Sequence, residues 1–135
     1  MDSNEIIVDA ANGILGRIAS YVAKQALLGK KVLVLNCSNA LITGNRRTTI
    51  SIYQHKRALG GSSLKGPFFP KLTDRLMKRT IRGMLPYKQE RGRLALKRIK
   101  CYTNIPKEYE QAKKISFITE VKSKIIKTEE LSREI

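Results

Sequence analysis

The chain has 135 residues, 41% of them hydrophobic, which suits one compact domain (1–135) and is too little for two. It carries 27 Lys and Arg against 11 Asp and Glu, for a formal net charge of +16. No window approaches the roughly 18 to 20 apolar residues of a membrane helix, and Asp2 and Glu5 stand where a secretory signal has a basic cap, so we expect a soluble, non-secreted protein.

The positive charge is concentrated in the middle of the chain. Residues 46–100 hold sixteen Lys and Arg and only two acids, Asp74 and Glu90, which gives this segment fourteen of the sixteen net charges. Such a segment repels itself unless a polyanion neutralises it, and the phosphate backbone is the commonest polyanion that basic domains meet. The distribution predicts a nucleic-acid-binding protein. Net charge alone also permits a DNA-compacting protein or one that binds acidic membranes.

The N-terminal third is predicted to form a strand, a helix and a strand. An apolar run at 5–9 precedes apolar residues at every third or fourth position over 15–28, and Gly29 supplies the usual helix stop. A continuous apolar run at 32–36 is typical of a parallel strand covered on both faces. This order predicts a right-handed βαβ unit, and a further short apolar run (40–43) follows.

The turn between this first strand and helix, NGILGR, lies where dinucleotide-binding loops also lie. The full GxGxxG pattern and the GxxxxGK[ST] phosphate loop are absent, so we favour a tight turn that Gly13 and Gly16 permit. Spare N–H groups at the helix start can still meet an RNA phosphate, and Arg17 would strengthen that contact. An enzyme with a Rossmann-like start that acts on a nucleotide or on RNA is the alternative.

A helix is compatible with 45–59, where cations cluster at the two ends. The next segment, GGSSLKGPFFPK at 60–71, is rich in Gly, Ser and Pro and is predicted to be a loop long enough to carry function. It holds Phe68 and Phe69 between lysines, the arrangement with which unpaired bases are stacked. The favoured interpretation is that both rings dock into the core and anchor the loop.

The sharpest signal is DRLMKRTIRGMLP at 74–86. On a helix, four cations of this segment fall within an arc of roughly 100° and four apolar residues fill another arc of similar width. The cations are Arg75, Lys78, Arg79 and Arg82, and the apolar residues are Met77, Ile81, Met84 and Leu85. Ordinary charged faces mix signs, whereas one acid accompanies these cations, so we expect a phosphate-contacting face. Gly83 and Pro86 predict where the helix ends.

The basic segment continues through 87–103, where a strand is expected over 96–102. The residues after Lys100 are nearly neutral, with seven basic and six acidic side chains. There we expect a turn at Pro106, a short extended segment, and a final helical turn capped by Thr128. This tail is expected to contact protein or to remain mobile rather than to bind RNA backbone.

Four segments carry a resemblance to a known family. They are VDAANGILGRIAS (8–20), VLVLNCSNALITGN (32–45), GPFFP (66–70) and KRTIRGMLPYKQERGRLALKRIKCY (78–102). Together they are similar, over about 5–110, to protein thirteen of the large ribosomal subunit in its archaeal form, and the IRGMLP core followed by RGR is the specific part. Residues 111–135 diverge from the family, and Asn104 stands where it commonly has glycine.

The resemblance implies the fold class, the function and the partners. The fold is expected to be α/β, a single three-layer α/β/α domain around a small, mainly parallel sheet. The function is expected to be binding of large-subunit ribosomal RNA, which supports subunit assembly and translation in the cytoplasmic ribosome. Neighbouring large-subunit ribosomal proteins are the other expected partners.

No reaction is expected, because His55 is the only histidine and no Ser/His/Asp or Cys/His set suggests a nucleophile. Cys37 and Cys101 lie far apart without a CxxC, so we expect neither a disulfide framework nor a zinc site, and a reducing compartment. No cofactor, metal, small-molecule substrate or membrane partner is expected. The residues expected to bind RNA are Arg17, Arg46, Arg47, Lys56, Arg57, Lys65, Lys71, Arg75, Lys78, Arg79, Arg82, Lys88, Arg91, Arg93, Lys97 and Arg98.

Overall fold

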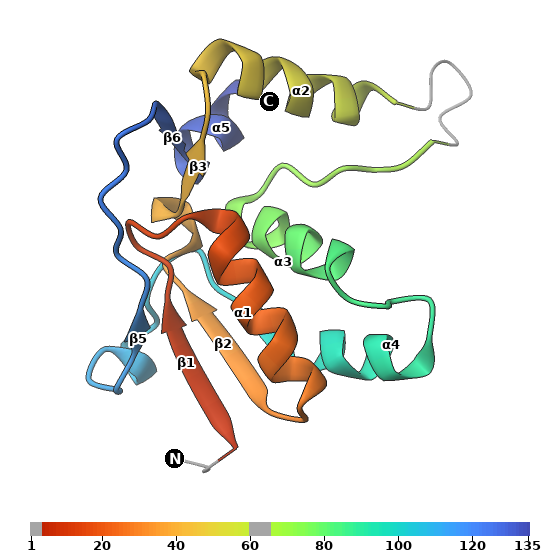
Figure 1. Cartoon of the computed structure of the whole chain (residues 1–135), viewed down its shortest axis with the longest axis vertical. Coiled ribbons are helices and arrows are strands. Elements are labelled where there is room, and N and C mark those ends of the chain that lie inside the picture. Colours follow the sequence, from red (N-terminus) through yellow and green to blue (C-terminus); the bar gives the residue numbers. More distant parts are fainter. Residues whose placement is uncertain (1–3, 60–65) are drawn as a thin grey trace.

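The computed structural model describes residues 4–59 and 66–135, and a four-stranded parallel sheet lies at its centre (Figure 1). The strand order is β4-β2-β1-β5, with β1 at Glu5–Asp9, β2 at Lys31–Leu35, β4 at Ile99–Cys101 and β5 at Ile115–Ser116. The two longest strands run in register from the pair Glu5 and Lys31 onward. The expected α/β fold around a small, mainly parallel sheet is therefore confirmed.

Helices cover one face of this sheet. They are α1 (Leu15–Leu27), α3 (Thr73–Gly83) and α4 (Glu90–Lys97). Alternate strand residues such as Val8, Val32 and Val34 pack against them in the main core, as the two-residue period of a strand dictates. In Figure 1, α1 passes in front of the sheet and β2 lies to the right of β1, which is the right-handed crossover that the sequence predicts.

The opposite face of the sheet has a thinner cover. Ile7, Leu33 and Leu35 point to this side and pack beneath the segment 102–112, which contributes Tyr102, Ile105 and Tyr109. That segment contains a single 3-10 turn, Lys107–Tyr109, and no α-helix. The third layer expected from the resemblance is thus an irregular segment held by aromatic side chains.

A second, smaller assembly stands at one end of the sheet (Figure 1). Strand β3 (Leu41–Thr43) pairs antiparallel with β6 (Ile125–Lys127), and each strand leads into a helix, α2 (Arg46–Ala58) and α5 (Thr128–Glu134). Leu131 of α5 is fully buried. The tail is therefore packed onto the body, in contrast to the mobile alternative.

Several sequence-based boundaries are wrong. The strand expected over 96–102 is shorter, because α4 continues to Lys97 and only Ile99–Cys101 pairs with β2. Thr128 does not cap α5: the cap residue is Lys127, and the buried Thr128 hydroxyl donates to the Ala40 carbonyl at 2.9 Å, which ties α5 to the start of β3. The Thr128 hydroxyl does bond to the backbone, but its partner lies 88 positions away in the chain rather than in the next helical turn.

Helix α3 ends at Gly83, and residues 84–88 form a turn, so the chain reverses at Pro86 as expected. Within the two described stretches of the chain, every helix is too short or too polar to cross a bilayer.

Candidate nucleic-acid interface

Helix α3 presents its cations outward because its other side is buried. Leu76, Met77 and Ile81 are nearly or fully inaccessible, and Met77 and Ile81 belong to the main core between α1 and the sheet. The expected apolar arc was partly wrong: Leu76 belongs to it, whereas Met84 is 44% exposed. Met84 lies in the turn that follows α3 and faces solvent, whereas Leu85 of the same turn is buried as expected.

The four cations of α3 form a ridge between two hollows. On one side, Arg75 and Lys78 border a hollow of about 300 Å³ that Lys100 also lines. Lys78 Nζ donates to the Ile99 carbonyl at 3.1 Å, so its ammonium is held beside the edge strand β4. On the other side, Arg79 and Arg82 border a second hollow.

This second hollow, which we call the aromatic hollow, lies between α2, residues 67–69 and the C-terminal part of α3. Its volume is about 660 Å³. Its cations and rings are Lys56, Arg79, Arg82, Tyr53, Phe68, Phe69 and Tyr87. Cations and rings from three separate segments thus meet in one place.

The cations of the aromatic hollow lie over its rings. Lys56 Nζ is 4.9 Å from the Tyr53 ring centroid and 5.3 Å from that of Phe69. The guanidinium carbon of Arg79 is 5.8 Å from the Phe69 centroid, and that of Arg82 is 4.2 Å from the Tyr87 centroid. These distances fall within the range of cation–π attraction. The stacking fixes the direction of long, otherwise mobile side chains.

The expectation that both phenylalanines dock into the core is wrong. Phe68 is 83% exposed. Phe69 is half-buried and packs edge-on against Tyr53, with 5.6 Å between centroids and an interplanar angle of 64°. The loop is therefore attached to α2 through Phe69, and it leaves the Phe68 ring facing solvent.

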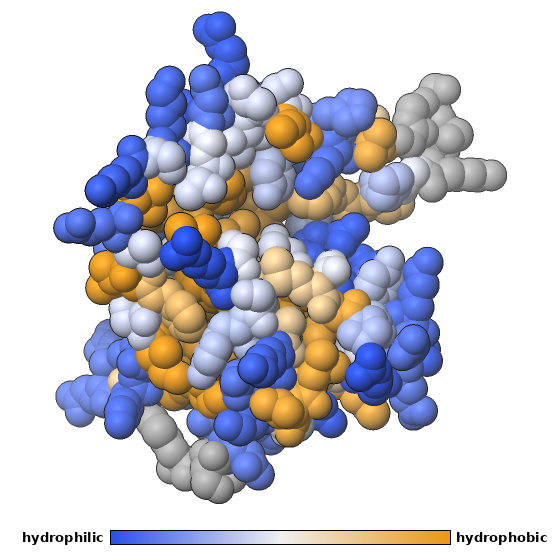
Figure 2. Space-filling view, viewed as in Figure 1, coloured by the Kyte–Doolittle hydropathy of each residue, from blue (hydrophilic) through white to orange (hydrophobic). Residues whose placement is uncertain are grey.

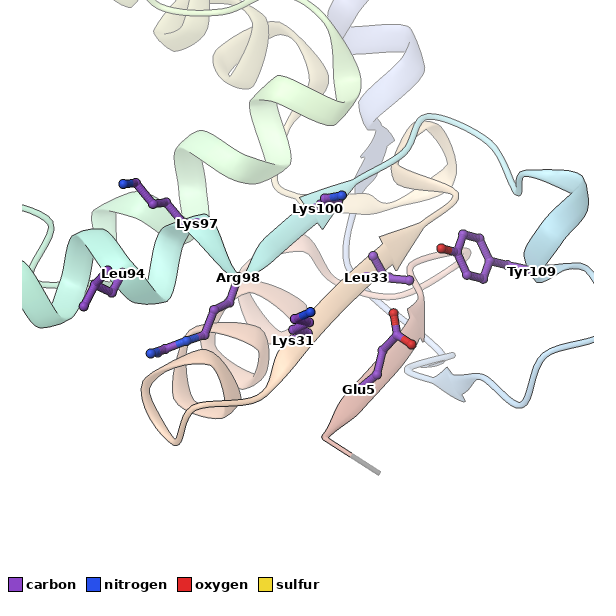
Figure 3. A pocket seen from close by; sticks show the side chains of 8 residues that line it. All are labelled: Glu5, Lys31, Leu33, Leu94, Lys97, Arg98, Lys100 and Tyr109. Carbon is purple, nitrogen blue, oxygen red and sulfur yellow. The ribbon is translucent and has the colours of Figure 1, made fainter. Parts of the chain in front are cut away.

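A third hollow, of about 480 Å³, lies at the amino ends of the parallel strands (Figure 3). Four cations line it, Lys31, Lys97, Arg98 and Lys100, against one acid, Glu5. Figure 3 shows Lys97 projecting from the end of α4, and Lys31 and Glu5 from adjacent strands. Arg98 also donates to the Ala26 carbonyl at 3.0 Å, where its charge complements the C-terminal end of α1.

Other predicted cations lie apart from the hollows. Lys88 lies on the turn before α4, Arg91 and Arg93 lie on α4, and all three are exposed. Figure 2 shows hydrophilic side chains gathered on the side of the molecule where Figure 1 draws α4. Further exposed cations are Arg17 on α1, Arg47 and Arg57 on α2, and Lys71 just before α3. Lys65 lies outside the described residues.

Arg46 differs from these cations because it has carboxylate partners. Its guanidinium pairs with Glu130 at 2.8 Å and with Glu134 at 3.5 Å, and this links α2 to α5. In the described part of the chain, no other Lys or Arg of the basic segment has a carboxylate within 4.0 Å. Within the described residues, acids of the chain itself therefore leave most of the charge of the segment unpaired.

The glycine turn before α1 is closed by the chain itself. A side chain at Gly13 would lie 2.8 Å from Ile18 and 3.0 Å from Phe117, and the Thr119 amide donates to the Asn12 carbonyl. Gly13 is therefore required for packing. The spare N–H groups at this helix start and Arg17 remain only a predicted phosphate contact.

Among the cations and tyrosines that line these hollows, sequence reasoning missed Lys31, Lys100, Tyr53, Tyr87, Tyr102 and Tyr109. Tyr53 and Lys56 are one helical turn apart, which is a usable signal for a stacked pair. For Tyr87 and Lys31 the local sequence carries no comparable signal, because their neighbours in the hollow come from distant segments.

The fold and these surfaces define a class of protein, a small α/β scaffold whose cation-rich and aromatic hollows fit the backbone and bases of a nucleic acid. Comparison with known proteins identifies the family within that class. The chain belongs to the ribosomal protein L13 family, whose model matches residues 3–108.

Individual relatives agree. The chain is 47% identical over 111 residues to the large ribosomal subunit protein uL13 of Methanosarcina barkeri, covering 82% of this chain and 79% of the relative. It is 46% identical over 110 residues to that of Methanococcoides burtonii, with 82% and 78% covered. The match to the protein of Thermoplasma volcanium is 41% over 133 residues and covers 96% of each chain, so it includes the tail. The archaeal resemblance seen in the sequence is confirmed.

Proposed function

We propose that this protein is a constituent of the large ribosomal subunit, where it binds large-subunit ribosomal RNA and supports subunit assembly and translation in the cytoplasm. The relatives are named as proteins of that subunit, and the family is a family of ribosomal proteins rather than enzymes. The observation that carries the RNA-binding role is that the basic segment leaves all its described cations except Arg46 without a carboxylate partner.

Binding of this kind needs no chemical step. Lys and Arg displace the counterions condensed on RNA, and the guanidinium fork bridges phosphates of strands that tertiary folding brings together. A protein that contacts only the folded RNA lowers its free energy relative to alternatives that it contacts less well. By stabilising the folded RNA in this way, the protein supports assembly of the subunit.

We place the principal contact surface on the ridge of α3, formed by Arg75, Lys78, Arg79 and Arg82. The exposed cations of α4 and α2 extend it. The nearly neutral tail after Lys100 is assigned to neighbouring ribosomal proteins, because it offers little net charge to a phosphate backbone.

The salt dependence of RNA affinity tests this surface. Replacing all four ridge cations by Gln should flatten the slope of log affinity against log salt by roughly 0.7 to 0.9 for each lost phosphate contact, with fragments of large-subunit RNA as ligand. The matched control replaces four exposed lysines outside the basic segment by Gln. These are Lys107, Lys113, Lys122 and Lys124. The control removes the same charge and should leave most of the slope intact.

Equal slopes for the ridge variant and the unaltered protein would remove the ridge from the proposal. Circular dichroism of each variant shows whether the fold is kept, which matters because Lys78 also bonds to the Ile99 carbonyl. Co-sedimentation tests the ribosomal assignment itself. A constituent of the large subunit should sediment with large ribosomal subunits after a high-salt wash. A DNA-compacting or membrane-binding protein that is held only by its positive charge should be released.

A further inference from the structure

We propose that the aromatic hollow is a stacking site for an unpaired RNA base, with the ring of Phe68 as its platform. This inference rests on the proposed function and specifies how part of the surface reads RNA. Phosphate contacts alone position an RNA, whereas a base-stacking site selects a place where the chain is single-stranded or a base is turned out.

The Phe68 ring is exposed to solvent. A phenylalanine that is 83% exposed contributes little to the core, and it stands in a hollow that contains three cations. The residues that line this hollow include no Asp or Glu. An exposed ring among unpaired cations matches an RNA nucleotide, which offers a flat base and a phosphate together.

The other rings of the aromatic hollow already have partners within the protein. Phe69 has the edge of Tyr53 and the charges of Lys56 and Arg79 within 6 Å, and Tyr87 lies beneath Arg82. Among the described residues, Phe68 has neither an aromatic partner nor a cation over its ring. Its faces are therefore available, and the ordered cations around it are placed to hold the phosphates that flank a stacked base.

The aromatic hollow is large enough for a base, and the segment that carries Phe68 is attached to α2. A volume of about 660 Å³ lies within the roughly 300 to 1,000 Å³ typical of sites that enclose a small molecule. Phe69 fixes the adjacent backbone to α2, so the Phe68 ring is presented from an anchored position. An anchored platform loses less conformational freedom on binding than a free loop does.

The test separates stacking from charge. The probes are an oligoadenylate about twelve nucleotides long, within the range of single-stranded site sizes, and an abasic ribose-phosphate strand of the same length and charge. The full chain should bind the oligoadenylate about 5-fold to 150-fold more tightly than the abasic strand, which is the span that one stacked base supplies. Phe68→Ala should abolish this difference, and Phe68→Trp should keep it.

Three controls complete the test. Phe68→Leu keeps an apolar side chain without a ring and should lose most of the discrimination, whereas Ile118→Ala, at a residue 71% exposed in the tail, should change nothing. An oligoglutamate of matched charge should compete poorly with oligoadenylate.

Equal binding of the two strands by the unaltered chain, or unchanged discrimination in Phe68→Ala, would overturn the stacking site. Competition by oligoglutamate as strong as by oligoadenylate would also overturn it in favour of an acidic protein segment. Each of these results is compatible with the proposed ribosomal role if the affinity of the protein for RNA still depends steeply on salt. Loss of all salt-dependent RNA binding would overturn both proposals.

Discussion

Gly92 lies where α4 passes closest to the turn that follows α3. A methyl group added at this position would overlap the carbonyl group of Pro86 and lie 2.9 Å from the backbone nitrogen of Tyr87. Both neighbours are backbone, so no side-chain rotation relieves the overlap. Gly92→Ala must therefore push α4 away from the turn that carries Tyr87.

Two opposing effects set the size of the change. Alanine in a helix is favoured over glycine by about 1 kcal/mol. Overpacking against a fixed backbone costs about 3 kcal/mol, at the upper end of the range for core insertions. The net expectation is a free energy of unfolding about 2 kcal/mol lower, and a melting temperature about 8 °C lower for a chain of this size.

The matched control is Gly83→Ala. Gly83 is the last residue of α3, and an added methyl group there meets no atom within 4 Å. The free energy of unfolding should rise by up to about 1 kcal/mol, because only the propensity effect remains. Urea unfolding followed by circular dichroism measures both variants. The reasoning is refuted if Gly92→Ala stays within about 0.5 kcal/mol of the unaltered chain, which is the range of ordinary surface changes.

Three further outcomes are expected. Ile81→Ala should lower the free energy of unfolding by about 2 to 5 kcal/mol, because Ile81 is fully buried beneath the α3 ridge, and a loss under 1 kcal/mol would show that it is not in the core. A double-mutant cycle of Arg46 and Glu130 should give a coupling energy of at most about 1 kcal/mol, since both side chains are roughly half exposed; a larger value would assign the pair a structural role that exposure argues against. Hydrogen bonding to Cys101 and burial raise the pKa of the Cys37 thiol above its ordinary value of 9.0. Above about pH 9 the unfolded thiol ionises while the folded one stays protonated, so between pH 9 and 10 the free energy of unfolding should fall by about 1 kcal/mol more than it does in Cys37→Ala, and equal losses over this window would disprove this.

The first half of the fold was predictable from the sequence because its signals are local. The apolar runs of β1 and β2 and the helical spacing over 15–28 each specify an element without help from elsewhere, and the structure has them within one or two residues. Helix α4 was missed because it is short and contains Gly92, a poor helix former that is needed there because the Pro86 carbonyl leaves no room for a side chain. Its state depends on packing that a local pattern does not contain.

The sequence predicted the charge of the candidate site but not how its side chains are arranged. Counting charges finds the basic segment, but it does not reveal that Arg46 is paired with acids 84 and 88 positions later. It also does not reveal that Phe68 and Phe69 take opposite roles, since the position of α2 decides which ring is covered. The ridge on α3 was visible because a helix places its own residues by a fixed angle.

Ultraviolet cross-linking within intact large ribosomal subunits, followed by mass spectrometry of the attached peptides, tests the central claim most directly. If the unpaired cations of the basic segment hold ribosomal RNA, peptides from 46–100 should carry the RNA adducts, with Phe68 and Tyr87 among the attachment points. Adducts confined to 4–45 and 101–135, in subunits that contain the protein, would contradict the account.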